Sequence, residues 1–268
     1  MAEELFTDDS MLRRVIREQV VGLSGPRALL MQAAHPVAFA GFFAHTGALD
    51  EPYERLARTA QVMDAIAFGE KAKAQKATRR VRAMHARVRG ELAEPVGRWP
   101  AGTPYAADDP DLLLWILATL VDSAVIVYER YVRRLSRAEK EALWVDYRVV
   151  GHEFGLTDDE MPEDWRAFRA YMSAMLGGGD LHVSDEARDL AIQIVMHPPV
   201  PLKFRPALEL ANQVTVGLMP RRLRREYGFR WDPVREVAVR TGAQYTKRVL
   251  VPLLPERMRL VRSARGAA

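Results

Sequence analysis

The sequence predicts an all-α protein with a single domain, and three observations support this prediction. Apolar residues recur at helical spacing along most of the chain, whereas strand-like alternation between turn residues is nearly absent. Prolines and small polar residues stand where helices would begin. The chain has 268 residues, of which 49% are apolar and 28% charged, and no linker or internal repeat divides it. We therefore expect one helical bundle over residues 1–268, with its core at about 20–233 and a basic helical tail after Pro255.

Each predicted helix begins at a recognisable signal. Proline suits the first turn of a helix because the backbone N–H groups of that turn form no hydrogen bond within the helix, so the N–H that proline lacks is not needed. Ser136 and Glu139 have the spacing of a capping box, in which each side chain satisfies the other's backbone N–H. We expect helical segments over residues 27–43, 52–68, 81–90, 110–133 and 137–153, and others that begin near Pro162, Ser184 and Arg205. An irregular loop is expected from about residue 94 to residue 110.

The composition excludes several classes of site and location. The chain has no cysteine, which rules out disulfides, thiolate nucleophiles, zinc–thiolate sites, iron–sulfur clusters and thiolate-ligated haem. Any metal must therefore be held by His, Asp, Glu, Met or Tyr. The first residues lack the basic and apolar regions of a secretory signal, so we expect a cytoplasmic protein. The longest apolar run, residues 112–128, is interrupted by Asp122 and Ser123, which predicts a buried helix and no transmembrane segment.

Basic residues are unevenly placed although the net charge is only +4. Eight Lys or Arg and no acid lie between Lys71 and Gly90, and a second cluster comprises Arg221, Arg222, Arg224 and Arg225. Such clusters could bind nucleic acid, anionic lipid or an acidic cofactor, or could form an ordinary solvated face. No interleaved aromatic residues or recognition module accompany them, so we expect no nucleic-acid partner.

A histidine flanked by arginines is the most informative feature for function. In a helix, Arg82, His85 and Arg89 share one face, with the imidazole between the two cations. The cations disfavour protonation of His85 and so keep a lone pair available for a metal, and they could also bind carboxylates. The alternative interpretation is a basic, solvated surface with one incidental histidine.

The other histidines do not form a known metal motif. The six histidines are His35, His45, His85, His152, His182 and His197, and none lies in a His-Glu-x-x-His or Glu-x-x-His pattern. A zincin or di-iron carboxylate site is therefore not expected. His35 precedes Pro36 in an apolar segment and is interpreted as a core histidine that bonds a backbone carbonyl; His45 is ambiguous.

Other catalytic motifs are also missing from the sequence. No nucleophile elbow, phosphate loop or dinucleotide fingerprint occurs, which removes the serine-hydrolase and nucleotide-binding interpretations. Asp122 interrupts the most apolar segment and needs a partner if it is buried and ionised. We expect an arginine to pair with it, among Arg82, Arg55 and Arg58; a carboxylic acid with a raised pKa beside a pocket is the alternative.

Six sequence blocks in a fixed order resemble the MpaB-like oxygenase family, which also contains the rubber-cleaving latex clearing proteins. One of them is the arginine–histidine block, and a second holds the Arg55, Arg58 and Thr59 side chains. Together the blocks extend over about residues 20–233, nearly the whole chain. The blocks are residues 25–36, 50–59, 68–69, 81–90, 105–110 and 217–220.

The resemblance implies an all-helical domain with a buried pocket for haem b. It implies that His85 is the proximal iron ligand and that Arg82 and Arg89 are haem-pocket residues. Arg55 and Thr59 match an Arg-x-x-x-Thr motif of the rubber oxygenases. Arg58 stands where the rubber-cleaving enzymes carry a distal lysine, so a lysine-ligated closed state is not expected here.

The function implied by the resemblance is oxidation of a small apolar substrate, such as an isoprenoid or unsaturated lipid, by dioxygen or peroxide at a haem b. Arg55, Arg58 and Thr59 are the expected catalytic residues. Phe39, Phe42, Phe43, Leu117 and Val121 are expected to line the substrate pocket. Two rival hypotheses are a haem carrier or sensor without turnover and a haem-free helical binding protein. A homodimer is compatible with the sequence.

Overall fold

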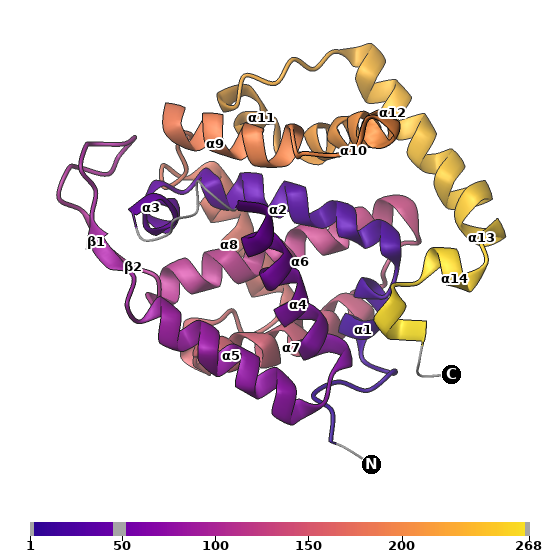
Figure 1. Cartoon of the computed structure of the whole chain (residues 1–268), viewed down its shortest axis with the longest axis horizontal. Helices are drawn as coiled ribbons and strands as arrows, with labels where there is room; N and C mark the ends of the chain where they lie inside the picture. The colour runs from indigo at the N-terminus through magenta and orange to yellow at the C-terminus, as the bar shows by residue number, and fades with distance from the viewer. Residues whose placement is uncertain (1–2, 45–51, 266–268) are drawn as a thin grey trace.

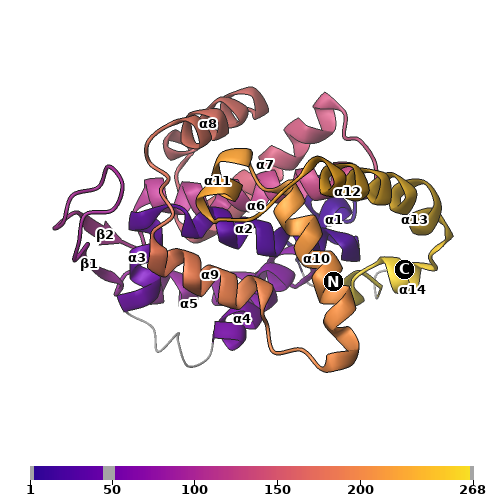
Figure 2. The same ribbon diagram turned by 90° about the horizontal axis from the view of Figure 1, so that it is seen from above.

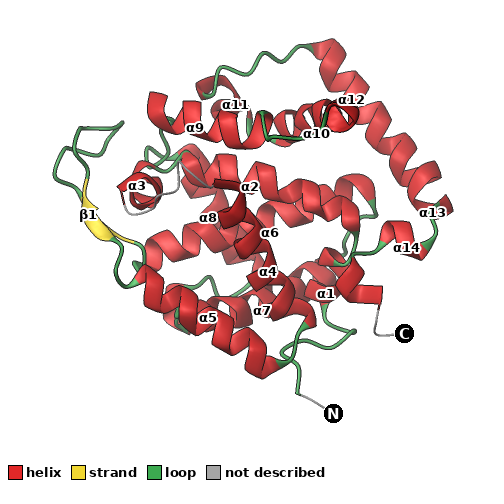
Figure 3. Ribbon diagram, in the orientation of Figure 1, coloured by secondary structure: helices red, strands yellow, loops and turns green. Residues whose placement is uncertain are grey.

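The computed structural model describes residues 3–44 and 52–265, apart from the side chains of residues 42–44, 52–56 and 190. It confirms the predicted all-α, single-domain fold, with one short β-hairpin at the periphery (Figure 1, Figure 3). The hairpin pairs β1 (Arg89–Glu91) with β2 (Pro104–Ala106) in antiparallel orientation. The α-helices are α1 (Met11–Ile16), α2 (Ser24–Ala33), α3 (Pro36–Ala44), α4 (Pro52–Phe68), α5 (Lys71–His85), α6 (Pro110–Tyr131), α7 (Arg137–Phe154), α8 (Trp165–Gly177), α9 (Asp185–Met196), α10 (Arg205–Leu218), α11 (Arg221–Glu226), α12 (Pro233–Tyr245), α13 (Val251–Leu253) and α14 (Glu256–Arg259).

Helix α6 is the centre of the fold. It begins at Pro110, and the Asp109 side chain accepts hydrogen bonds from the N–H groups of the first turn, as an N-cap does. It packs against α2 on one side and α7 on the other, while α9 and α10 cover the far side of α2 (Figure 1). Trp115 and Trp144 are fully buried in the resulting core. The large apolar area removed from water here is the main source of stability.

Within the described ranges, α6 is the one helix long and apolar enough to cross a membrane. At 22 residues it is longer than the interrupted apolar run suggested, but 72% of its most apolar stretch is buried inside the protein. Burial of this kind is typical of a core helix in a bundle, because its apolar faces are already covered by neighbouring helices.

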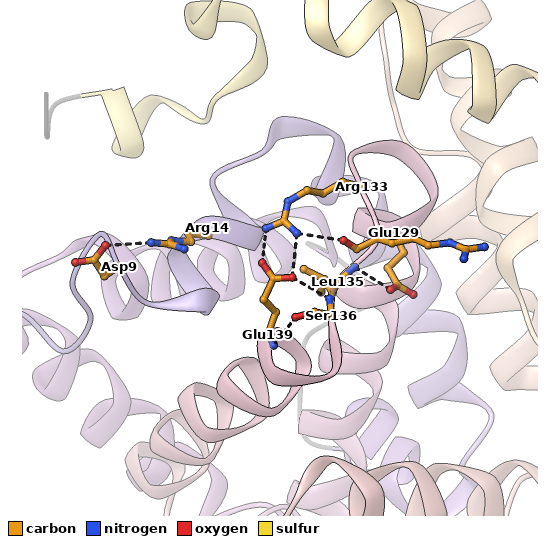
Figure 4. A network of polar contacts seen from close by, with 8 residues as sticks. Asp9, Arg14, Glu129, Arg133, Leu135, Ser136 and Glu139 are labelled. Carbon is orange, nitrogen blue, oxygen red and sulfur yellow. Dashed lines mark hydrogen bonds and ion pairs between the residues drawn. The ribbon is translucent and has the colours of Figure 1, made fainter.

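The connection from α6 to α7 is fixed by a network of polar contacts (Figure 4). The predicted capping box is present: Glu139 N donates to Ser136 Oγ at 3.2 Å, and Ser136 N donates to Glu139 Oε2 at 2.8 Å. Arg133 adds two hydrogen bonds to the Glu139 carboxylate, at 2.6 and 3.0 Å. Its guanidinium and the capping N–H together lower the pKa of Glu139 to about 2. The Leu135 N–H donates to Glu129 and closes the turn.

Asp122 has a different partner from those expected. The Asp122 carboxylate accepts hydrogen bonds from Arg27 at 2.9 Å and from Arg169 at 2.7 Å, so pairing with Arg82, Arg55 or Arg58 was a wrong prediction. Arg27 is 2% exposed and also donates to Ser123 Oγ and to the Leu218 carbonyl. This network joins α2, α6, α8 and the end of α10, and it leaves every polar group of the buried Arg27 paired.

Three local predictions differ from the structure. The segment expected at 27–43 is two helices, since Pro36 and the preceding turn interrupt it before α3. His35 is buried as expected, but its Nδ1 accepts a hydrogen bond from the Ala38 N–H rather than donating to a carbonyl. The loop expected at 94–110 contains β2.

The helix expected at residues 81–90 ends at His85. The chain then makes tight turns, with Arg87 N bonded to the Met84 carbonyl, and enters β1. Gly90 allows this course because a Cβ there would lie 2.5 Å from the Tyr105 hydroxyl on β2. Gly90 therefore permits the close packing of β1 against Tyr105 of β2, just after the end of α5.

Candidate active site at the end of helix α5

His85 is the last residue of α5, and its side chain is partly exposed. Its carbonyl accepts a hydrogen bond from Val88 N, which helps to turn the chain toward the hairpin. Helix α5 packs against α4 and α7. From the end of α5 the chain passes into the hairpin, on one edge of the bundle (Figure 1). The imidazole is therefore at the protein surface without being fully open to water.

Arg89 does not lie on the helical face of His85, which corrects the prediction of a three-residue stripe. It is the first residue of β1, beyond the end of α5. Its guanidinium forms an ion pair with Asp108 at 2.6 Å and donates to the Ala86 carbonyl. The arginine is exposed, so this ion pair contributes little to stability, but it ties the hairpin to the residues just before α6.

Arg82 remains on α5, one turn before His85. Its guanidinium lies against the end of α7: a Cβ built on Gly155 would be 3.2 Å from Arg82 Nε. Gly155 ends α7 with a φ of 104°. A cation at this place interacts favourably with the partial negative charge of the helix C-terminus. Arg82 therefore has a structural partner in addition to any ligand it binds.

The residues of the second motif lie on the N-terminal half of α4, the helix that packs against α5. Arg58 and Thr59 are exposed, and so are Ala57 and Ala60 beside them. Arg55 lies outside the residues whose side chains are described. The structure thus places the histidine motif and the arginine–threonine motif on two helices that pack against each other.

The expected walls of a substrate pocket are only partly present. Phe39 is buried on α3, whereas Leu117 and Val121 are packed in the core of α6, Leu117 next to Gly151 of α7. Both side chains belong to the main core cluster. Phe42 and Phe43 lie outside the described side chains, as does His45. A hollow of about 460 Å³ lies beside the hairpin and is lined by Arg89, Gly90, Glu91, Pro104, Tyr105, Ala106 and Asp109.

A buried aromatic cluster near α3 was missed by the sequence analysis. The His35 ring lies 5.5 Å from Trp99 and 6.4 Å from Trp115, measured between ring centroids. Burial lowers the pKa of His35 to about 4, so its imidazole is neutral at physiological pH. The only sequence signal was the His-Pro pair, because Trp99 and Trp115 are more than 60 residues away.

The candidate metal ligand at this site is a single imidazole, that of His85 at the end of α5. No group of three or more His, Asp or Glu residues that could hold a metal ion occurs in residues 3–44 and 52–265, as far as their side chains are described. Iron inside a porphyrin needs only one or two protein ligands, and one imidazole can supply the proximal bond. His85 has that chemistry, and Arg82 offers a cation one turn away for a haem carboxylate.

Comparison with known proteins identifies the family. The sequence model of the family described as "ER-bound oxygenase mpaB/B'/Rubber oxygenase, catalytic domain" matches residues 13–248. No curated protein and no solved structure gave a match. The match covers α1 to α12 and includes both motifs described above. The chain therefore belongs to the family of MpaB and rubber oxygenase catalytic domains, whose members are oxygenases.

Proposed function

We propose that the protein is an oxygenase that uses haem b, with His85 as the protein ligand of the iron. The observation that carries this proposal is the position of His85: a partly exposed imidazole at the end of α5, a helix that packs against α4, inside the region matched by the oxygenase family. Bound haem would supply the activation of dioxygen or peroxide that an oxygenase needs and that protein side chains cannot provide.

The residues around His85 have separate roles in this proposal. His85 would donate a ring-nitrogen lone pair to the iron. Arg82 can bind a carboxylate of the cofactor. Arg89 is already paired with Asp108, so we propose that it holds the hairpin in place and contacts the cofactor only secondarily.

On α4, the Arg58 guanidinium carries N–H donors and no acceptor, so we propose a hydrogen-bonding role for it and not that of a base. Its N–H groups and the Thr59 hydroxyl can donate hydrogen bonds that orient an oxygen-containing group. Arg55 is proposed to belong to the same set, because it precedes Thr59 by one helical turn.

The proposed substrate is apolar, with an isoprenoid or unsaturated lipid as the expected class. Helix α3, of sequence Pro-Val-Ala-Phe-Ala-Gly-Phe-Phe-Ala, carries no polar side chain at all. It contacts both strands of the hairpin that follows His85. An apolar helix packed on the hairpin that follows His85 supports an apolar ligand, because a polar one would lose its hydrogen bonds to water there.

The test is an absorption spectrum of the protein purified after expression with haem supplied. We expect a Soret band in the wild type and its loss or large reduction in His85→Ala. His182→Ala is the matched control, since His182 is also exposed but lies in a loop after α8. Retention of an unchanged Soret band in His85→Ala would remove His85 from the iron.

Oxygen or peroxide consumption with candidate lipids then separates an enzyme from a haem carrier or sensor. We expect substrate-dependent consumption by the haem-loaded wild type. Haem binding without any turnover would support the carrier, and no haem binding would support a haem-free binding protein.

A further inference from the structure

The longest surface helix presents an apolar face to the outside. Helical residues continue from α12 through a π-helical turn (Thr246–Leu250) into α13, so residues 233–253 form one helix. Its side chains at positions 234, 237, 241, 245, 249 and 253 recur at three to four residues and share one face. Val234 is 77% exposed, Leu253 76% and Tyr245 55%, and Val237, Val249 and Leu250 are also exposed. We refer to Val234, Val237, Tyr245, Val249, Leu250 and Leu253 as the outer stripe.

The opposite face of the same helix is the one packed on the protein. Ala243 and Val251 are buried, and Lys247 donates a hydrogen bond to the Glu129 carbonyl at 2.8 Å. Val239 lies close to Gly217 of α10. A surface helix ordinarily turns a polar face outward, and here the outward face carries large exposed apolar side chains. The outer stripe therefore marks an interaction surface.

The charges around the outer stripe indicate an anionic partner. Residues 233–265 contain eight Lys or Arg and two acids. Arg248, Arg257 and Arg262 are exposed and form no hydrogen bond or ion pair with any residue that the structure describes. Glu236, in contrast, is occupied by Trp231 at 2.8 Å and faces Arg224 and Arg240. Arg248 thus lies within the span of the stripe, and Arg257 and Arg262 follow it in the chain, whereas Glu236 is already committed; the second acid, Glu256, is exposed in the first turn of α14.

We propose that the outer stripe docks the protein on the surface of a phospholipid bilayer with anionic headgroups. The apolar side chains would enter the boundary between headgroups and acyl chains, and Arg248, Arg257 and Arg262 would contact the headgroup phosphates. Helix α6 takes no part in this attachment, because it is buried in the core. In Figure 1 and Figure 2, α12 and α13 lie along one outer edge of the molecule, next to α14, where a flat surface can reach them.

A second copy of the chain fits this surface less well. A symmetric dimer would place the same stripe of both copies together, and with it the uncompensated arginines of both copies. Like charges brought together at an interface oppose association. An anionic bilayer removes this repulsion and still buries the apolar side chains.

The chain's lack of cysteine gives a direct readout of docking. Val249→Cys, labelled with an environment-sensitive dye, reports on the outer stripe. Val145→Cys is the matched control, because Val145 is a 51% exposed valine on α7. We expect a blue shift of the dye at position 249, and none at 145, when vesicles of phosphatidylcholine with phosphatidylserine are added. No shift at 249 overturns the proposal.

Vesicle flotation of the full-length protein measures the strength of binding. We expect binding to the phosphatidylserine vesicles, little to phosphatidylcholine alone, and a decrease at high salt. Val237→Asp with Leu253→Asp should weaken binding more than about tenfold through lost apolar burial. Arg248→Gln should weaken it about fivefold.

Val145→Asp and Arg80→Gln, on other surfaces, are the controls for the flotation assay and should bind like the wild type. Equal losses in the controls and the stripe variants would overturn the proposal. The proposal would also be overturned if the wild type did not bind vesicles but formed a dimer in light scattering, and if the stripe variants were monomeric. The assay works with and without haem, so its result is independent of the proposed catalytic function.

Discussion

His35 is a buried base whose protonation the fold opposes. It is 5% exposed, beside Trp99 and Trp115, and burial lowers its pKa from 6.5 to about 4. Between these two pH values the unfolded chain binds more protons at this site than the folded chain. The stability that His35 contributes is therefore complete above about pH 6.5 and is lost as the pH falls toward 4.

The prediction at this residue is a change in the pH dependence of unfolding. Asn at position 35 can still accept the Ala38 N–H but does not titrate. We expect His35→Asn to be less stable than the wild type at pH 7.5, because the aromatic contacts are lost, and to lose less stability between pH 6.5 and 4.5. Urea unfolding at several pH values measures this. Parallel pH profiles for the two proteins would contradict the assignment.

At the scale of elements, the buried Arg27–Asp122 pair connects four helices. Asp122 is 3% exposed and lies between Arg27 of α2 and Arg169 of α8. Asp122→Asn would leave the buried guanidinium of Arg27 without its counter-charge, and such a loss typically costs about 3–5 kcal/mol. Thermal or urea unfolding checks this. Asp111→Asn, at an exposed position near the start of the same helix, is the control and should change stability by less than about 1 kcal/mol.

The start of α7 gives a second prediction for an element. Ser136→Ala removes the side chain that accepts the Glu139 N–H, and loss of an N-cap typically costs about 1 kcal/mol. Ser136→Asp keeps an acceptor at this place and should recover most of the stability. Urea unfolding of the two variants provides the comparison. Equal stability of Ser136→Ala and the wild type would show that Arg133 and Glu139 hold the turn without the cap.

The sequence predicted elements that are set by local signals and failed where distant residues decide. Pro52, Asp109 and Ser136 mark helix starts through contacts within a few residues, and the structure has α4, α6 and α7 there. The chain after His85 forms a hairpin in which Tyr105 packs closely against Gly90, and no local pattern reveals this pairing. The partners of Asp122 are 95 and 47 residues away, so neither was predictable from spacing on one helix.

At the scale of the whole molecule, the candidate site combines predicted and unpredicted parts. The motif residues on α4 and α5 were named from the sequence, and the structure places their helices side by side. The separation of Arg89 from the helical face of His85 follows from the hairpin. The sequence drew attention to His35 because Pro36 follows it. It did not indicate Trp99 and Trp115, which come close to His35 only in the folded chain.

Cofactor binding should also be visible in the stability of the whole protein. A ligand that binds only the folded state raises the free energy of unfolding, by about 2.7 kcal/mol at a hundredfold excess over its Kd. We expect added haem to raise the Tm of the wild type and of His182→Ala, and to have a much smaller effect on His85→Ala. Differential scanning fluorimetry or calorimetry measures the shift. Equal shifts in all three proteins would place the haem elsewhere.

The central claim is the bond between His85 and iron, and the iron–histidine stretching band in the resonance Raman spectrum of the ferrous protein tests it most directly. We predict that the band is present in the wild type, absent in His85→Gly, and replaced by an iron–imidazole band when imidazole is added to that variant. An iron–histidine band that persists in His85→Gly without imidazole would contradict the claim.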